Sequence, residues 1–344
     1  MNNHASKPSA DLPYFSPLFA WQSQAWEQVV QQFYDDKLPH GLLAGGMAGI
    51  GKHAFVWRLA AWLLCTNKTK NGACGVCQSC HWLTAGTHPD LLVLPNESLP
   101  TAEIDEKTDK ASSIKIDDIR ALQEYGHIKG RGVRLIVLDG AERLTLGASN
   151  ALLKTLEEPR AGVYLILISD NPTRLLPTIK SRVQTLPLRQ IAYDVALDFI
   201  TQKLGDRQLA SLCLDLADGA VLSAIKLPQA VWFDQRALWI KTWLALRNGQ
   251  RQPIVASDYW QKMMAFTDFI TLTRLMLVDV MRVGLCLDSR HTDIHVANLM
   301  QNQTLDLVRI EHFLTVLDDM VMAVGQNVQE KMAYDGMFYE LARL

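Results

Sequence analysis

Seven residues between a short apolar run and a helical pattern limit the possible folds of this chain more than any other feature of its sequence. Residues 42–44 read as a buried strand, and the stretch Gly46-Met-Ala-Gly-Ile-Gly51-Lys52 follows closely. Glycines in such a loop let the backbone wrap around phosphates, and a lysine opening the next helix reaches the β- and γ-phosphates. The order of strand, glycine-rich loop and helix therefore predicts a P-loop fold, with Gly46, Gly51 and Lys52 in a nucleotide site.

Short continuous apolar runs alternate with helical patterns throughout the first half of the chain. Runs of this kind are typical of a parallel sheet that is covered by helices on both faces. We therefore predict an α/β domain with a doubly wound parallel sheet over residues 1–188. The predicted strands cover residues 42–44, 91–94, 135–138, 163–168 and 183–186.

The pattern changes after residue 188, where no further run predicts a strand. Residues 189–228 read as several short helices, with a break at Gly205 and Asp206, and residues 229–344 read as longer helices. We predict a small helical domain followed by a larger all-α domain. The longer helical patterns cover residues 237–246, 259–287 and 305–324.

Charge and the lengths of the apolar runs argue against a nucleic-acid binder that works by charge alone and against a membrane or secreted protein. The chain of 344 residues has 34 Lys and Arg against 36 Asp and Glu, a net charge of −2, which argues against a nucleic-acid binder that works by charge alone. Its apolar runs fall far short of the roughly 18 residues that a membrane helix needs, and its N-terminus lacks the apolar core of a signal peptide. We expect a cytoplasmic protein with reduced cysteines and no membrane partner.

The predicted nucleotide site departs from an active one at two positions. His53 follows the lysine, where a Ser or Thr hydroxyl would hold Mg²⁺, and imidazole is a poor ligand for that hard cation. Asp139 ends an apolar run and fits the acidic residue of a Walker B strand, but Gly140 stands where a hydrolytic glutamate would follow. We predict that Asp139 belongs to a vestigial site that does not hydrolyse ATP.

Four of the six cysteines fall within sixteen residues. Cys65, Cys74, Cys77 and Cys80 have the spacing C-x8-C-x2-C-x2-C. Four converging thiolates make a closed tetrahedral zinc site, which leaves no position for a reacting water molecule. We predict one structural zinc ion in an insert over residues 65–80.

Three further stretches, taken in order, carry a resemblance to a known family. They are NALLKTLEEP at 150–159, YLILISDNP at 164–172 and LPTIKSRV at 176–183. Together with the P-loop and the cysteine insert, they resemble the bacterial clamp-loader family of AAA+ proteins, most strongly over the first 190 residues. The resemblance implies an AAA+ domain at 1–188, a helical lid at 189–228 and an oligomerising collar at 229–344.

The resemblance also implies a role for Arg182. In that family a Ser-Arg-Cys motif supplies an arginine finger to the ATP site of a neighbouring subunit, and here the motif is Ser181-Arg182-Val183. A guanidinium group stays charged and bonds two oxygens at once, which suits it to the charge that develops on a transferred phosphoryl group. Leu222 stands where the family's ATPases carry a sensor arginine in the lid. The implied function is a non-hydrolysing subunit of the DNA polymerase III clamp loader that supplies Arg182 in trans.

Implied partners are the motor and delta subunits of the loader, the sliding clamp and, in the assembled complex, primed DNA. On this interpretation the chain is no enzyme alone but part of a DNA-directed DNA polymerase holoenzyme. A basic run of Lys129, Arg131 and Arg134 could add phosphate contacts. Three alternatives remain open. The first is an ATP-hydrolysing motor subunit, which would have to tolerate His53 and Gly140. The second is a zinc-dependent nucleic-acid-binding module, which would bind DNA in a salt-sensitive way, and the third is a clamp-loader-like paralogue that acts outside replication.

Overall fold

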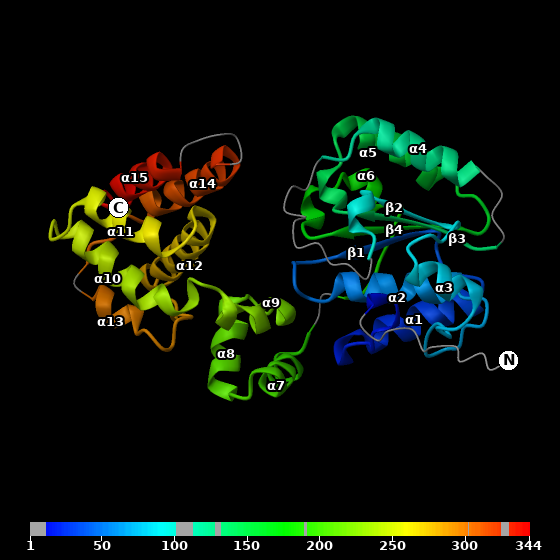
Figure 1. The fold of residues 1–344 in the computed structure, drawn as a ribbon, viewed down its shortest axis with the longest axis horizontal. Helices are drawn as coiled ribbons and strands as arrows, with labels where there is room; N and C mark the ends of the chain where they lie inside the picture. The colour runs from blue at the N-terminus through cyan, green and yellow to red at the C-terminus, as the bar shows by residue number, and fades with distance from the viewer. Residues whose placement is uncertain (1–11, 101–112, 128–131, 189–190, 302, 325–329) are drawn as a thin grey trace. The chain divides into compact units, whose positions relative to one another are not determined.

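The computed structural model describes residues 12–100, 113–127, 132–188, 191–301, 303–324 and 330–344 (Figure 1). Its backbone contacts divide the chain into two compact units, Met1–Val195 and Ala196–Leu344. The division of the second unit at residue 228, into lid and collar, stays a prediction.

A five-stranded sheet forms the centre of the first unit. Every strand pair is parallel, and the strand order is β2-β3-β4-β1-β5. The predicted parallel sheet is thus confirmed, although the last strand is only two residues long. The strands are β1 (Gly41–Gly45), β2 (Leu91–Leu94), β3 (Arg134–Asp139), β4 (Val163–Ser169) and β5 (Gln184–Thr185).

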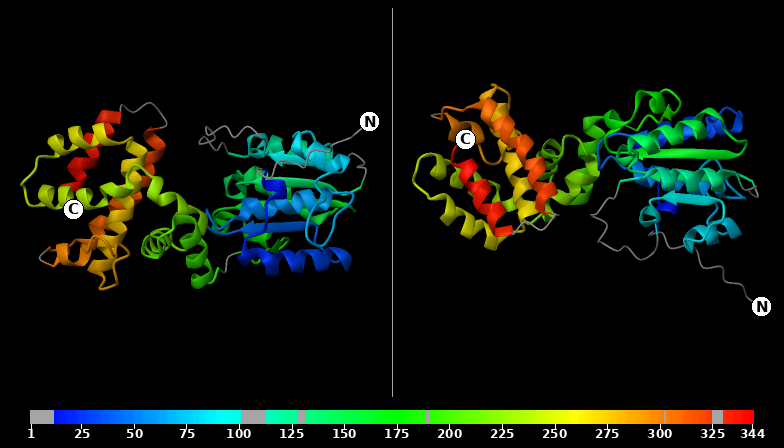
Figure 2. Two further views of the ribbon diagram at one scale, coloured as in Figure 1. Left: turned by 60° about the horizontal axis from the view of Figure 1, so that its bottom comes forward. Right: turned by 90° about the horizontal axis from the view of Figure 1, so that it is seen from above.

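Helices cover both faces of this sheet, as the predicted double winding requires (Figures 1 and 2). One face carries α1 (Ser23–Tyr34), α2 (Lys52–Leu64) and α3 (Gln78–Thr84). The opposite face carries α4 (Ile116–His127), α5 (Leu146–Glu157) and α6 (Pro177–Lys180). The 3₁₀ helices of this unit are η1 (Pro13–Phe15), η2 (Ala20–Gln22), η3 (Asn96–Ser98), η4 (Ala141–Arg143) and η5 (Pro172–Arg174).

Alternate residues of the central strands enter two separate cores. Leu42 and Ile166 pack in the core that includes α1 and α2, whereas their neighbours Leu43 and Leu167 pack in the core that includes α4 and α5. Successive side chains of a strand point to opposite faces, so a strand that is buried on both sides must be apolar at every position. This is why these strands appear in the sequence as continuous apolar runs.

The second unit is helical throughout its described residues. Asp206 caps α8 by accepting hydrogen bonds from two backbone amides, which confirms the predicted break after Gly205. The single helix expected over residues 259–287 was wrong, because Met264 is extended and separates α11 from α12. The elements are α7 (Tyr193–Leu204, which begins in the first unit), α8 (Arg207–Leu216), α9 (Val221–Lys226), η6 (Leu227–Gln229), η7 (Phe233–Gln235), α10 (Arg236–Arg247), α11 (Pro253–Met263), α12 (Phe266–Gly284), α13 (Val296–Met300), α14 (Leu307–Val324) and α15 (Glu330–Leu341).

None of the helices in the described part of the chain combines the length and the apolar character that a membrane crossing requires.

Candidate functional site

The P-loop joins the carboxyl end of β1 to the start of α2 and is anchored by the segment before α1. Trp21 donates its indole N–H to the carbonyl of Ile50 at 3.0 Å, and Gln22 donates its amide to the carbonyl of Gly51 at 2.9 Å. Gly51 has a φ of 89°, and a Cβ there would lie 2.8 Å from the Gln22 amide and 3.0 Å from the Phe19 ring. Only glycine fits this position without a shift of its neighbours.

Lys52 is turned inward and is already bonded within the chain. Its side chain is 1% exposed, and its Nζ donates to Asp170 Oδ1 at 2.6 Å and to the carbonyl of Met47 at 2.7 Å. Asp170 directly follows β4, the strand beside β1. A carboxylate therefore makes the charge-assisted contact that a nucleotide phosphate makes to a P-loop lysine. Any phosphate that entered would have to displace Asp170 from Lys52.

His53 and Asp139 form a second ion pair at this end of the sheet. His53 Nε2 lies 2.9 Å from Asp139 Oδ1. Burial lowers the pKa of His53, but the hydrogen bond and the negative charge of Asp139 outweigh it and raise the pKa above its ordinary value. Burial raises the pKa of Asp139, and the bond and charge of His53 outweigh that effect and lower it. The imidazole thus bonds the carboxylate oxygen that a Walker B aspartate would turn towards a Mg²⁺ ion.

Gly140, the residue after Asp139, has a left-handed backbone and lies against the guanidinium of Arg143. Its φ is 72°, and a Cβ built there would lie 2.1 to 2.4 Å from the guanidinium of Arg143. Arg143 is held in that place because its Nη2 donates to the carbonyl of Asp139 at 2.9 Å. The space that a side chain at position 140 would need is therefore filled by the guanidinium of Arg143.

Arg182 lies at the opposite end of β1 from the P-loop. The carbonyl of Arg182 is 3.3 Å from a Cβ built on Gly41, the first residue of β1, whereas the P-loop follows Gly45, the last. The four steps from Gly41 to Gly45, at about 3.3 Å each, separate the two by about 13 Å or more. Arg182 therefore lies too far from its own P-loop to act there.

The Arg182 guanidinium is held by its own domain but stays accessible. Its Nη2 is 2.7 Å from Glu157 Oε1, and its Nη1 donates to the carbonyl of Thr178 at 3.1 Å. The side chains of Arg182 and Glu157 are 36% and 48% exposed. Val183, the residue in place of the family's cysteine, is buried beside Gly41.

The four predicted cysteine ligands converge between the end of α2 and the start of α3. All are free thiols, and the four sulfur atoms lie within 4.8 Å of one another. The Sγ–Sγ distances are 3.5 Å for Cys65–Cys74 and Cys77–Cys80, 3.8 Å for Cys65–Cys77 and 4.0 Å for Cys74–Cys80. Disulfide sulfurs would be about 2.05 Å apart, whereas sulfurs around a tetrahedral ion at about 2.3 Å lie about 3.8 Å apart. The geometry fits a four-coordinate metal ion.

The thiols of this cluster differ in acidity. Burial raises the pKa of Cys65 and of Cys80, and the bonded neighbouring thiols raise both further. Burial also acts to raise the pKa of Cys77, but hydrogen bonds that involve Thr66 and Cys80 outweigh it and lower that pKa to about 5. Because a metal ion binds thiolates, a bound cation would release the protons that these thiols carry.

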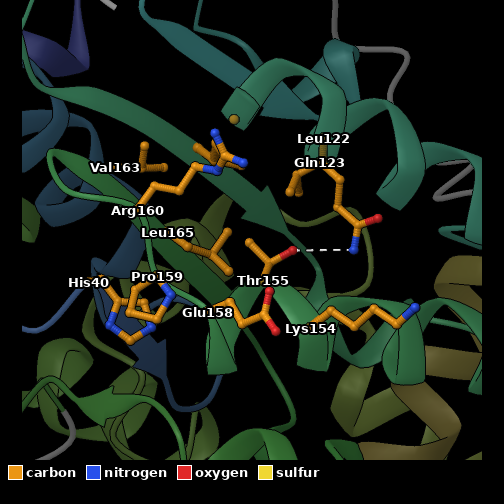
Figure 3. Close-up of a pocket in the computed structure, with 12 residues that line it drawn as sticks. His40, Leu122, Gln123, Lys154, Thr155, Glu158, Pro159, Arg160, Val163 and Leu165 are labelled. Atoms are coloured by element: carbon orange, nitrogen blue, oxygen red, sulfur yellow. Dashed lines mark hydrogen bonds between the residues drawn. The ribbon is translucent and has the colours of Figure 1, made fainter. Parts of the chain in front are cut away.

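A cavity of about 200 Å³ lies at the amino ends of β1, β3 and β4, between α4 and α5 (Figure 3). Its lining includes His40, Gln123 and Glu158, and Gln123 Nε2 donates to Thr155 Oγ1 at 3.4 Å. In open parallel sheets, ligands bind beyond the carboxyl ends of the strands. This cavity therefore lies away from the P-loop and is no part of the predicted nucleotide site.

Arg134, the one residue of the predicted basic run that the structure describes, is buried. Arg134 is 5% exposed, its Nη2 is 3.2 Å from Asp90 Oδ1, and its guanidinium lies over the Tyr125 ring at 4.5 Å. It is buried because it opens a central strand, so it cannot contact DNA phosphates. Lys129 and Arg131 lie outside the described residues.

The structure brings the sequence-predicted residues together in three groups. Gly46, Gly51, Lys52 and Asp139 lie at the carboxyl end of the sheet, Arg182 lies at the amino end, and the cysteines form their own cluster. Sequence reasoning missed two partners, Asp170 and Glu157. Asp170 lies in the YLILISDNP stretch and Glu157 in the LEEP stretch, but neither motif indicates which residue it contacts.

Comparison with known proteins gives consistent matches. The family described as DNA polymerase III, delta subunit, matches residues 21–192, a span that includes all three groups. The DNA polymerase III subunit delta' of Pseudomonas aeruginosa is 37% identical over 248 residues, which are 70% of this chain and 69% of the relative. That of Yersinia pestis is 32% identical over 248 residues, which are 70% and 68% of the two chains. Among solved structures, a DNA polymerase III gamma subunit-related protein from Thermotoga maritima aligns with 94% of this chain and 99% of its own, at 17% identity and a TM-score of 0.46.

Proposed function

Since this chain belongs to the family of delta' subunits of DNA polymerase III, we propose that it supplies Arg182 to the ATP site of a neighbouring clamp-loader subunit while hydrolysing no ATP itself. The observation that carries the proposal is an asymmetry between two cations. Lys52 is buried and paired at the chain's own nucleotide site, whereas Arg182 is accessible at the far end of the same strand.

Three features support a nucleotide site that does not work. Asp170 bonds Lys52, His53 bonds Asp139, and the guanidinium of Arg143 fills the space beside Gly140. A P-loop NTPase needs its lysine free for phosphate, a hydroxyl and an aspartate for Mg²⁺, and a group that orients the attacking water. Here Lys52 and Asp139 are already paired within the chain, and His53 stands where the Mg²⁺-binding hydroxyl would be.

The chemistry proposed for Arg182 is electrostatic. As the γ-phosphoryl group moves from ATP to water in the neighbour's site, negative charge develops on its oxygens, and a guanidinium can bond two of them at once. Arg182 would bring that charge across the subunit interface. Turnover then depends on closure of the interface, so that ATP hydrolysis is coupled to assembly and to clamp loading on primed DNA.

The test is the ATPase activity of the reconstituted clamp loader with clamp and primed DNA. Arg182→Ala should leave assembly intact and slow the site it serves by about 10³-fold or more, the effect of removing an arginine finger. Lys180→Ala, an exposed cation two residues away, is the matched control and should keep wild-type turnover. Unchanged turnover in Arg182→Ala would sink the finger assignment.

We also propose that the cysteine cluster holds one structural zinc ion. Four sulfurs at tetrahedral spacing match a closed zinc site, whose role is to tie the insert to the end of α2. Metal analysis of protein purified without chelator should find one zinc per chain, and Cys74→Ser should lower both the zinc content and the thermal stability. Well under one zinc per chain in the native protein would contradict this assignment.

The proposed partners are the motor and delta subunits of the loader, the sliding clamp and primed DNA, in the cytoplasm. Residues 229–344 would form the collar that joins the subunits. The alternative of a motor subunit is disfavoured by the two ion pairs at the P-loop. The alternative of a zinc-dependent DNA-binding module is disfavoured by the burial of Arg134 and by the net charge of −2.

A further inference from the structure

The Arg182 side chain is not free in the isolated chain, and its main ionic contact is Glu157. The pair joins the last residue of α5 to the turn after α6, with 2.7 Å between Nη2 and Oε1. A second bond, from Nη1 to the Thr178 carbonyl, ties the guanidinium to the turn itself. Of these two contacts, only the one with Glu157 involves a negative charge.

Glu157 occupies a position where a carboxylate gains little from its own helix. The carboxyl end of a helix carries partial negative charge, which disfavours an acidic side chain there. The adjacent Glu158 adds a like charge nearby. Arg182 supplies the opposite charge that offsets both effects. Since Glu157 and Arg182 are 48% and 36% exposed, the pair is weak and can be exchanged for a stronger anion.

We propose that Glu157 is a positioning residue that holds Arg182 against its own domain until the ATP of a neighbouring subunit displaces it. The proposal rests on the finger role of Arg182 proposed above. A triphosphate offers more negative charge than one carboxylate and presents two oxygens to the same fork. The finger therefore leaves Glu157 only when a nucleotide is present across the interface, which limits unproductive closure of an empty site.

The proposal predicts a specific kinetic signature. While Arg182 is bonded to Glu157, it cannot contact the neighbour's ATP. The apparent affinity for ATP is therefore the intrinsic affinity multiplied by the fraction of molecules in which Arg182 is released. Glu157→Gln keeps the shape of the side chain but removes its charge, so it should lower the KM for ATP of the reconstituted loader about two- to fivefold, the range for an exposed ion pair. The kcat should stay unchanged, because Glu157 does not contact the reacting phosphate. The difference from wild type should shrink with added salt, which screens exposed charges.

Three further variants isolate the pair. Glu157→Asp keeps the charge and should stay closer to wild type than Glu157→Gln. Glu158→Gln removes the adjacent charge, which lines the cavity of Figure 3, and should leave the KM as it is. In an Arg182→Ala background, Glu157→Gln should have no further effect, since a double-mutant cycle isolates the coupling between the two residues.

The outcomes separate this proposal from the one on which it rests. An unchanged or higher KM in Glu157→Gln, with Arg182→Ala still strongly impaired, overturns the holding role and leaves the finger in place. A fall in kcat in Glu157→Gln also overturns it, because Glu157 would then orient the finger productively. An Arg182→Ala loader with wild-type turnover overturns the finger role itself.

Discussion

The two ends of one parallel sheet treat their cations in opposite ways. At the carboxyl end, Lys52 is buried, and both Lys52 and His53 are bonded to carboxylates of the same chain. At the amino end, Arg182 is more than one-third exposed and held by one half-exposed carboxylate. The charged groups at the carboxyl end are paired within the chain, whereas the guanidinium at the amino end stays accessible.

This difference shows that the P-loop can keep its backbone conformation while its charged side chains pair within the chain. The glycines of the P-loop are still required, because Gly51 adopts a left-handed conformation against Gln22 and Phe19. The charged side chains that follow the same loop, Lys52 and His53, form ion pairs inside the domain. A buried, paired charge is costly to expose, whereas an exposed pair exchanges partners at little cost.

Conservative substitutions of Arg182 and of Lys52 should differ most in their effect on the loader's ATP turnover. Arg182→Lys keeps the charge but loses the planar fork, so turnover at the neighbour's site should fall about tenfold or more. Lys52→Met keeps the apolar stem, removes the charge, and should change the loader's ATPase less than twofold. Both are measured as DNA- and clamp-stimulated ATP hydrolysis by the reconstituted loader. Equal losses of ATP turnover in the two variants would contradict the proposed difference between the two ends of the sheet.

Substitution of Asp170 should partly restore the access of a phosphate to Lys52 at the P-loop. In Asp170→Asn, the buried Lys52 ammonium keeps only the Met47 carbonyl and a neutral amide as partners. Because Asp170 is itself half exposed, we expect a loss of about 1–2 kcal/mol of unfolding free energy. The apparent affinity for ATP should rise about tenfold, since a phosphate no longer has to displace a charge. The measurements are denaturant unfolding and nucleotide titration.

Asn171→Ala, a change at the adjacent exposed residue, is the control for Asp170→Asn. It should alter neither the unfolding free energy nor the nucleotide affinity. An Asp170→Asn protein that binds ATP no better than wild type would mean that another feature closes the site.

The smallest expected effect is the pH dependence of the His53–Asp139 pair. The pKa of His53 is raised and that of Asp139 is lowered in the folded chain. The histidine contribution is full below its unfolded pKa of about 6.5 and is lost as pH rises through the folded value. The aspartate contribution is full above about 3.9 and is lost as pH falls through the folded value. The pair therefore stabilises most between about pH 4 and 6.5, by under about 1 kcal/mol.

An NMR titration of the His53 ring checks this directly. The ring should titrate above its ordinary pKa, and Asp139→Asn should lower the midpoint. A midpoint that does not change in Asp139→Asn would show that the two side chains are not paired in solution.

Much of the fold was predictable because its strands are buried on both faces. Residues 135–138, for example, are buried and apolar at every position, and the alternation of such runs with helical patterns predicted a parallel sheet. The break between α11 and α12 was not predictable, because Met264 and Ala265 carry no glycine or proline signal. The order of the strands depends on long-range packing and was not predicted either.

The candidate site was predicted residue by residue but not contact by contact. The spacing of the four cysteines predicted their cluster, because ligands that lie close together in the sequence can readily converge on one metal ion. By contrast, Lys52 and Asp170 are 118 residues apart, and their contact follows only from the pairing of β1 with β4. The same reason explains Arg134, which looked like a surface charge in the sequence and is buried by its place at the start of β3.

The most direct test of the closed nucleotide site is a titration of the purified chain with a fluorescent ATP analogue and Mg²⁺, with turnover followed in the same sample. With Lys52 held by Asp170, and Asp139 held by His53, we expect no Mg²⁺-dependent binding and no turnover. Tight Mg²⁺-dependent binding with steady turnover would contradict this, and would make the chain a motor subunit in its own right.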